Sequence, residues 1–185
     1  AGGTSFVVAV AEDEPQNIID QKSIDTRGPK ETLDEVVQYF QIYQNRTKKS
    51  FDALGVASFG PIDLNKNSET YGYITSTPKQ SWKNCDILGT IRKGLGDIST
   101  FGFDTDVNGA ALAMAIHFST EKNINSLAYC TVGTGVGVGI LSHNQLIHGL
   151  LHPEAGHVYF PRADGDSKEV FDGTCPFHGD CLEGL

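Results

Sequence analysis

Two thiols and an imidazole lie within seven positions near the end of the sequence. Cys175, His178 and Cys181 have the spacing Cys-x2-His-x2-Cys, and His157 precedes the first of them by eighteen residues. Thiolate sulfur and imidazole nitrogen are the usual ligands of a tetrahedral structural zinc ion. We therefore predict a structural Zn²⁺ site with these four ligands. The competing interpretation is a disulfide between the two cysteines, which a reducing intracellular compartment disfavours.

Two carboxylates accompany the predicted metal ligands. Glu154 precedes His157 by three positions, and Glu183 follows Cys181 by two. Carboxylates accept hydrogen bonds from hydroxyl groups, so the metal would hold a substrate pocket in shape rather than perform chemistry. The competing interpretation of Glu154 is a solvated loop carboxylate, and we interpret His152 in the same segment as a bystander.

Asp106 follows a predicted strand over residues 100–104 and precedes a predicted helix over 107–118. A carboxylate at such a junction can cap the helix by accepting a hydrogen bond from a backbone N–H group. It can also act as a general base that takes the proton from a hydroxyl group attacking a phosphoryl group. The sequence leaves both roles open.

Two turns rich in glycine and threonine each precede an apolar strand. Backbone N–H groups in such turns can form a nest for phosphate oxygens. The second turn lacks the Lys-Ser/Thr of a Walker A loop, and a strand rather than a helix follows it, unlike a Rossmann turn. A glycine-rich hairpin without a ligand is the competing interpretation. The candidate phosphate-binding residues are Gly2, Gly3, Thr4, Gly133, Thr134, Gly135 and Gly137.

The elements that must position these residues form an α/β pattern in which hairpins and crossover helices alternate. We predict helices over 30–43 and 107–118 and a short helix within 82–94. Strands or extended segments are predicted over 5–10, 18–26, 51–58, 71–78, 100–104, 126–132 and 136–141 and near residue 146, with a tight turn at 143–144.

The composition is that of an ordinary soluble protein of 185 residues, long enough for one domain or two small ones. The 23 acidic and 14 basic residues give a net charge of −9 without a basic cluster, so we predict no nucleic-acid or membrane partner. We predict that the protein has no signal peptide and a cytoplasmic location. Of the other cysteines, Cys130 is predicted to be buried and Cys85 to lie near a helix start.

Both ends of the sequence suggest that it is part of a longer polypeptide. It opens in a glycine turn with no strand before it, and it stops two residues after Glu183.

In combination, these segments resemble the ROK family of sugar kinases from end to end and in the right order. The spacing Cys-Pro-x-His-Gly-Asp-Cys is similar to that of the bacterial zinc-containing fructokinase branch. The matching segments are residues 1–4, 58–63, 75–78 with Trp82, 104–111, 132–137, 152–157 and 175–184.

The resemblance implies an actin-like, ribonuclease H-like fold of two lobes with ATP and Mg²⁺ between them. Residues 1–106 would form the first lobe, and residues 107–185 would begin an incomplete second lobe. Asp106 matches the catalytic base of the family, and a homodimer is a family expectation. The positions that match or line the sugar site are Gly60, Thr105, Glu154, His157 and Glu183.

The implied activity is ATP-dependent phosphorylation of a hexose, with D-fructose converted to fructose 6-phosphate as the first choice. Ser5 replaces a lysine found in many relatives after the first glycine turn, which would weaken phosphate contacts. Thr105 replaces an asparagine that often contacts the sugar, a change that suits a fructokinase. The alternatives are a sugar-sensing ROK regulator or noncatalytic sugar-binding protein, and a zinc-stabilised interaction module.

Overall fold

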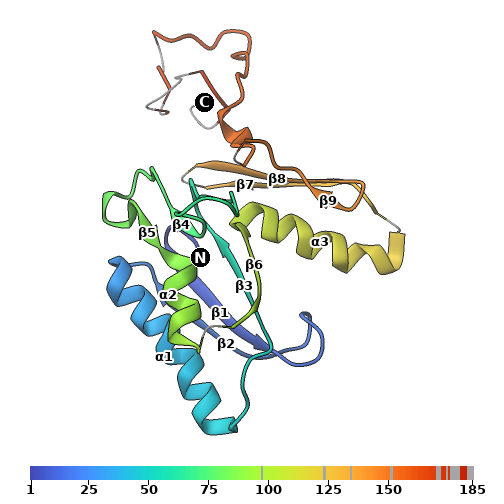
Figure 1. Cartoon of the computed structure of the whole chain (residues 1–185). Coiled ribbons are helices and arrows are strands. Elements are labelled where there is room, and N and C mark those ends of the chain that lie inside the picture. The colour runs from blue at the N-terminus through green and yellow to red at the C-terminus, as the bar shows by residue number, and fades with distance from the viewer. Residues whose placement is uncertain are drawn as a thin grey trace. The chain divides into compact units, whose positions relative to one another are not determined.

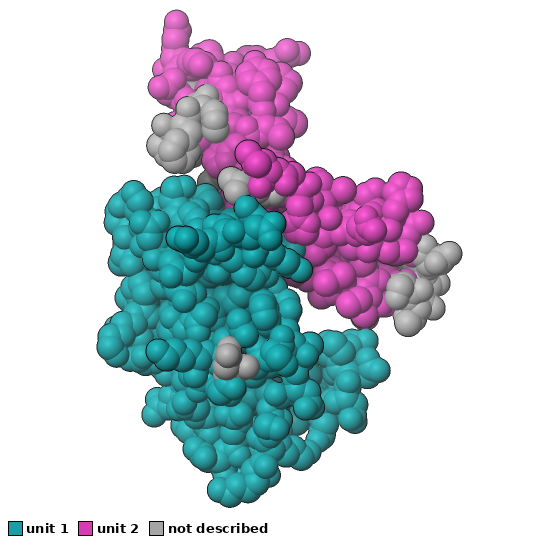
Figure 2. All heavy atoms as spheres, in the orientation of Figure 1, with its two compact units in different colours: residues 1–106 teal, residues 107–185 magenta. Residues whose placement is uncertain are grey.

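The computed structural model divides into two compact units, residues 1–106 and residues 107–185 (Figure 2). Each unit is described by itself below. Within the parts of the chain that the structure describes, no helix combines the length and apolar character that a membrane crossing needs. The described residues are 1–96, 98–122, 124–133, 135–150, 152–169, 172–173, 175 and 180–182.

Unit 1 begins with the predicted hairpin of β1 (Ser5–Ala11) and β2 (Ile18–Asp25), which pair in antiparallel fashion (Figure 1). Phe6, Val8 and Val10 alternate along β1 and are all buried, as the two-residue period of a half-buried strand requires. This strand therefore contributes one apolar face to the core of unit 1.

Helix α1 (Pro29–Thr47) extends four residues beyond the helix predicted over 30–43. Its first turn contains Pro29, whose fixed backbone angle suits that position. It ends at Lys48, which has a left-handed conformation with φ of 59° and donates its backbone N–H to Gln44 O at 2.7 Å. Leu33, Val36 and Tyr43 are buried at helical spacing, and α1 packs against β2 and α2.

Strands β3 (Ala53–Ser58) and β6 (Thr100–Thr105) form a parallel pair in which Ser58 lies opposite Thr105. The carboxyl ends of both strands therefore meet at one edge, where they lead into the segments 58–63 and 104–111 that the sequence singled out. The predicted strand over 51–58 is shorter than expected, and its residues are mostly only half-buried.

The short helix predicted within residues 82–94 is confirmed and occupies the last eight of them. A 3₁₀ turn, η1 (Gln80–Trp82), and a short strand, β5 (Cys85–Asp86), precede α2 (Ile87–Gly94). Asp86 caps α2, because its Oδ1 accepts the backbone N–H of Gly89 at 2.8 Å. The extended segment 71–78 likewise contains only the two-residue strand β4 (Tyr73–Ile74), which pairs with β5.

Trp82 lies at the centre of the unit 1 core and is only 1% exposed. Its ring contacts Phe6 and Phe59 at centroid distances of 5.4 and 5.6 Å, and its Nε1–H donates to Arg27 O at 2.8 Å. A buried indole with a satisfied N–H group fixes the backbone around it. The same core also contains Ile24, Leu33, Val36, Ile62, Ile74, Ile87, Leu88, Ile91 and Phe103.

Helix α3 (Asp106–Lys122) starts at the last residue of unit 1 and continues through unit 2. Unit 2 also contains an antiparallel sheet in the order β7 (Leu127–Val132), β8 (Val136–Ser142) and β9 (Gln145–Leu146). The predicted turn at 143–144 joins β8 and β9 through two residues with positive φ. Cys130 on β7 is exposed, so the prediction that it is buried is wrong. The 3₁₀ turn η2 (Ala155–His157) follows the sheet in the sequence.

Candidate functional site

The first glycine turn, residues 2–4, is fixed at the carboxyl end of β3. Phe59 donates its backbone N–H to Ala1 O at 2.8 Å. Thr26 holds the turn from the other side, since its Oγ1 donates to Gly2 O at 2.8 Å and its backbone N–H donates to Thr4 O at 2.9 Å. The turn therefore has a defined geometry next to the segment that contains Gly60.

Asp63 stabilises the loop that follows Gly60. Its Oδ1 accepts the backbone N–H of Asn65 at 2.9 Å, and its Oδ2 accepts the hydroxyl of Thr70 at 2.6 Å. Burial of the carboxyl group opposes its ionisation, but hydrogen bonds from Ser68, Thr70 and Asn65 outweigh this effect and lower the pKa of Asp63. A charged, fully engaged carboxylate here orders the loop rather than facing a ligand.

Asp106 follows the carboxyl end of β6 and is the first residue of α3. The preceding Thr105 is buried, and its backbone N–H donates to Asp104 Oδ1 at 2.8 Å. Asp106 itself is exposed. Phe59, directly after β3, holds the backbone of Ala1, and the carboxyl end of β3 pairs with that of β6, which leads into Asp106. Asp106 and residues 2–4 thus belong to the same part of unit 1.

The second glycine segment is the hairpin between β7 and β8, and its glycines do different work. A Cβ atom added at Gly139 would lie 2.1 Å from Val107 O, and one added at Gly137 would lie 2.8 Å from Val107 Cγ1. These two positions therefore let β8 approach the start of α3 closely. Gly133 has open space where a side chain would stand, and its N–H donates to Gly135 O at 2.9 Å. Thr134 lies outside the described residues.

Glu154 is held by a residue whose role the sequence did not reveal. His152 is buried, and its Nδ1 lies 3.0 Å from Glu154 Oε1. The hydrogen bond to His152 lowers the pKa of Glu154, against the opposing effect of partial burial. Among the described residues His152 is not part of the cluster of metal-ligating side chains, which agrees with its interpretation as a bystander to the metal, but it orients Glu154. Its place two residues before Glu154, across a proline, was the only available signal.

The conformation of Glu154 is also unusual. Its φ of 47° and ψ of 43° lie in the left-handed region, which costs energy for a residue with a side chain. The carbonyl of Glu154 accepts the backbone N–H of His157 at 2.9 Å, which begins η2. The carboxylate and the imidazole are thus positioned by one short segment.

Three of the four predicted metal ligands lie together in unit 2. His157 Nδ1 is 3.6 Å from Cys175 Sγ and 3.7 Å from Cys181 Sγ, and the three ligand atoms lie within 4.8 Å of one another. Tetrahedral zinc, with bonds of about 2.3 Å to sulfur and about 2.0 Å to nitrogen, separates these atoms by roughly 3.6 Å. The donor set therefore fits zinc. His178 lies outside the described residues, as does Glu183.

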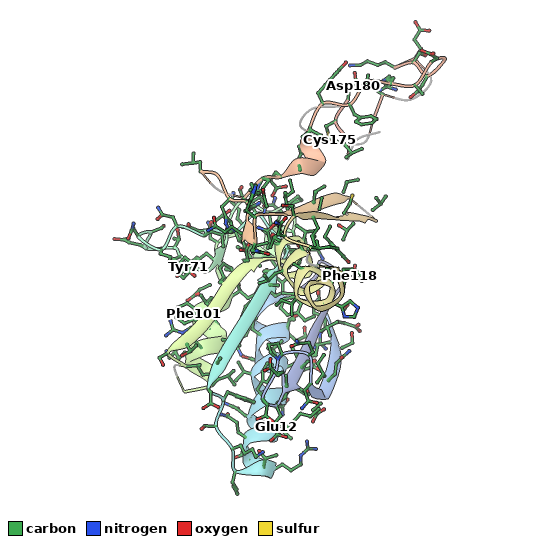
Figure 3. The ribbon with its side chains drawn as sticks, turned by 90° about the vertical axis from the view of Figure 1, so that its right-hand side faces the viewer. Glu12, Tyr71, Phe101, Phe118, Cys175 and Asp180 are labelled. Atoms are coloured by element: carbon green, nitrogen blue, oxygen red, sulfur yellow. The ribbon has the colours of Figure 1, made fainter. Side chains whose placement is uncertain are left out.

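A short backbone pairing brings Cys181 to His157. Tyr159 and Cys181 form an antiparallel bridge, and Leu182 donates its backbone N–H to Val158 O at 3.0 Å. Next to this bridge, Asp180 Oδ1 accepts from Arg162 Nη2 at 2.7 Å, and its Oδ2 lies 3.0 Å from Lys168 Nζ. Figure 3 labels Asp180 and Cys175 in this segment. If this pairing slipped by one residue, a neighbour of Cys181 would lie beside His157. These contacts therefore fix which residue can act as the metal ligand.

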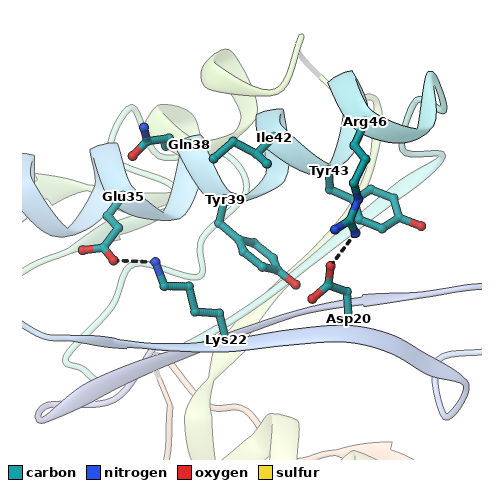
Figure 4. A pocket seen from close by; sticks show the side chains of 8 residues that line it. All are labelled: Asp20, Lys22, Glu35, Gln38, Tyr39, Ile42, Tyr43 and Arg46. Atoms are coloured by element: carbon teal, nitrogen blue, oxygen red, sulfur yellow. Dashed lines mark hydrogen bonds and ion pairs between the residues drawn. The ribbon is translucent and has the colours of Figure 1, made fainter.

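A surface depression of about 240 Å³ between α1 and β2 contains none of the predicted site residues (Figure 4). Its charged groups are paired across it, Lys22 with Glu35 and Arg46 with Asp20, each at 2.8 Å. Burial raises the pKa of Tyr39 to about 12, and the Asp20 carboxylate adds to this shift. These contacts join α1 to the hairpin of β1 and β2, so we interpret the depression as part of the packing of unit 1.

Comparisons with known proteins identify the family and the fold of the chain. The sequence model of the ROK family matches residues 1–185. A fructokinase of Streptococcus mutans serotype c is 44% identical over 185 residues, which are 100% of this chain and 60% of that protein. A ROK hexokinase structure from Thermus thermophilus has a TM-score of 0.71 at 21% identity and covers 100% of this chain and 57% of that one.

A ROK family glucokinase from Streptomyces griseus, solved in complex with glucose and AMPPNP, has a TM-score of 0.63 at 21% identity. The match covers 100% of this chain and 53% of the glucokinase chain. The fold is therefore the actin-like, ribonuclease H-like α/β fold that the sequence predicted. The chain belongs to the ROK family. It spans about 60% of the length of the curated fructokinase it matches.

Proposed function

We propose that the protein containing this chain phosphorylates a hexose with ATP and that its preferred substrate is D-fructose, converted to fructose 6-phosphate. The observation that carries this proposal is the position of Asp106. Its carboxylate follows the carboxyl end of β6, begins α3 and lies near a tethered glycine turn in unit 1. Identity of 44% with the S. mutans fructokinase supports the choice of sugar.

Asp106 is proposed as the general base that accepts the proton from the attacking sugar hydroxyl. Its exposure leaves the carboxylate accessible to a substrate, and its place in the first turn of α3 fixes its backbone. Phosphoryl transfer needs little more from the protein than positioning and neutralisation of charge. Asp106 would accomplish the first of these by orienting the hydroxyl group.

The two glycine segments are proposed to hold the phosphates of ATP. In unit 1 these residues are Gly2, Gly3 and Thr4, and in unit 2 the open space at Gly133 favours a ligand there. The proposal also includes Thr134, Gly135 and Gly137, although the packing of Gly137 against Val107 gives it a structural role as well. A Mg²⁺ ion bound with ATP would neutralise charge on the phosphates.

The sugar is proposed to contact Glu154 and His157, with Gly60, Thr105 and Glu183 completing the pocket. The hydrogen bond from His152 fixes the orientation of Glu154 and favours its ionised form. An oriented carboxylate can accept two hydrogen bonds from neighbouring sugar hydroxyls. Discrimination among hexoses would arise from the placement of these acceptors.

A structural Zn²⁺ ion is proposed to be held by His157, Cys175, Cys181 and His178. When bound, it would supply folding energy rather than activate water. Because His157 follows Glu154 by three residues, the same ligands would keep the Glu154 carboxylate in the sugar pocket. A cytoplasmic location and a homodimer, both expected from the sequence, remain part of the proposal.

The direct test is an ADP-release assay of the full-length protein with fructose, mannose, glucose and N-acetylmannosamine. We expect fructose to give the highest kcat/KM. In the Asp106→Asn variant we expect kcat to fall at least about a thousandfold, with sugar binding largely unchanged. Normal turnover by that variant would refute the general base. Tight sugar binding by a wild-type protein without any turnover would identify a sugar-sensing regulator instead.

A further inference from the structure

The segment 75–82, which contains Thr75-Ser-Thr-Pro and Trp82, has a conspicuous sequence and no role in the site described above. Both of its ends are anchored in unit 1. Thr75 donates its backbone N–H to Pro61 O at 2.7 Å, Thr77 is 3% exposed, and Trp82 is 1% exposed. The indole N–H of Trp82 donates to Arg27 O at 2.8 Å. Residues between these anchors are therefore held in place.

Lys79 is the residue that this anchored segment presents to the first glycine turn. Its backbone N–H donates to Thr77 Oγ1 at 3.3 Å, and its carbonyl accepts the backbone N–H of Trp82 at 2.8 Å. The ammonium group of Lys79 donates to Gly3 O. A Cβ atom added at Gly3 would lie 3.4 Å from Lys79 Cε and 4.0 Å from Nζ, so the side chain lies directly against the turn.

Lys79 brings a positive charge to the turn, where the neighbouring groups are neutral or negative. Ser5, the residue that follows the turn, is neutral. Asp106, the proposed base, would repel phosphate, and the whole sequence has a net charge of −9. The cations Lys22 and Arg27 of unit 1 are both paired with the carboxylate of Glu35. Lys79 instead contacts a neutral carbonyl at the turn itself.

We propose that Lys79 binds the phosphate oxygens of ATP at the turn of residues 2–4. The ammonium group supplies the positive charge that Ser5 does not. An ammonium on a flexible stem can turn from Gly3 O to a phosphate oxygen without movement of the anchored backbone. This inference rests on the proposed function, because it assigns a further ligand contact to the same phosphate turn.

The test compares Lys79→Met with Lys83→Met in the full-length protein. Lys83 directly follows this segment and is exposed, and within the part of the chain that the structure describes its ammonium group makes no hydrogen bond to the turn, so it is a matched control for lost charge. We expect Lys79→Met to raise the KM for MgATP about tenfold, as loss of a hydrogen bond to a charged group does, with the KM for the sugar unchanged. Lys79→Arg should recover most of the affinity, and Lys83→Met should match the wild type.

Two results would overturn the inference. One is a lower melting temperature of Lys79→Met with an unchanged KM for MgATP, which would make Lys79 a structural tie to Gly3. The other is a raised KM for the sugar alone. If the wild type phosphorylates no sugar, MgADP binding measured by calorimetry tests Lys79 separately. Weaker binding by Lys79→Met than by Lys83→Met supports the contact, and equal binding refutes it.

Discussion

Single residues in this protein depend on neighbours whose roles the sequence motifs do not reveal. Glu154 has a strained backbone conformation and depends on His152 for its orientation. A lone histidine in a sequence gives no hint of such a partner, which is why sequence analysis missed it. The spacing of Cys175, Cys181 and His157, by contrast, could be read directly, because thiol and imidazole side chains at such intervals have few other uses.

Asp63 allows a prediction about pH at this scale. Its pKa is lowered in the folded protein, so the folded state gains stability from the ionised carboxylate at any pH above the unfolded pKa. That contribution is lost as the pH falls through the lower, folded value. Asp63→Asn should therefore destabilise the protein by about 1 kcal/mol at pH 7, with a smaller difference from wild type near pH 3.

Urea unfolding at both pH values measures the effect, and Asp52→Asn is the control because Asp52 is exposed. A difference between wild type and Asp63→Asn that stays constant with pH would contradict the assignment.

At the scale of elements, the sequence predicted those that depend on local pattern. Helix α1 and the two hairpins follow apolar periodicity and turn residues, and the structure contains them. The short helix within 82–94 is present, but its bounds could not be predicted, because burial of Trp82 in the core, a tertiary contact, sets the backbone before it. Exposure of Cys130 was missed for a similar reason, since strand composition alone does not say which face of β7 is covered.

The contact of β8 with the start of α3 gives a sharp test of what the glycines do. Gly139→Ala would place a methyl group 2.1 Å from Val107 O and should destabilise the protein by about 2 kcal/mol or more. Gly133→Ala, which meets nothing within 4 Å, should change stability by less than about 0.5 kcal/mol. Thermal unfolding of both variants measures this, and equal melting temperatures would argue that β8 and α3 do not pack closely.

At the scale of the whole molecule, the residues with proposed roles are divided between the two units. Unit 1 contains Asp106, Lys79 and the first glycine turn, whereas unit 2 contains the second turn and the cluster of His157 with two cysteines. Among the described residues that follow η2, no further helix or strand is formed, and residues 180–182 are joined to residues 158–168 by backbone hydrogen bonds and the Asp180 ion pairs. A metal ion there would contribute disproportionately to stability.

Removal of the metal should therefore lower the melting temperature of the full-length protein by at least about 5 °C and weaken sugar binding. Cys181→Ser should reproduce the effect without a chelator, whereas Cys130→Ser should not, because Cys130 belongs to β7 and not to the cluster. Metal content by mass spectrometry and calorimetry measure both parts. Unchanged melting after complete metal removal would exclude a structural role.

The exposure of Cys130 also makes this protein convenient to label. Burial raises the pKa of the Cys85 thiol to about 11, so little of it is in the reactive thiolate form at neutral pH. Bound zinc would shield Cys175 and Cys181 from alkylation. Cys130 is accessible and lies three residues before Gly133. If the proposed phosphate contacts of the adjacent hairpin form, a fluorophore attached to Cys130 would report on nucleotide binding there.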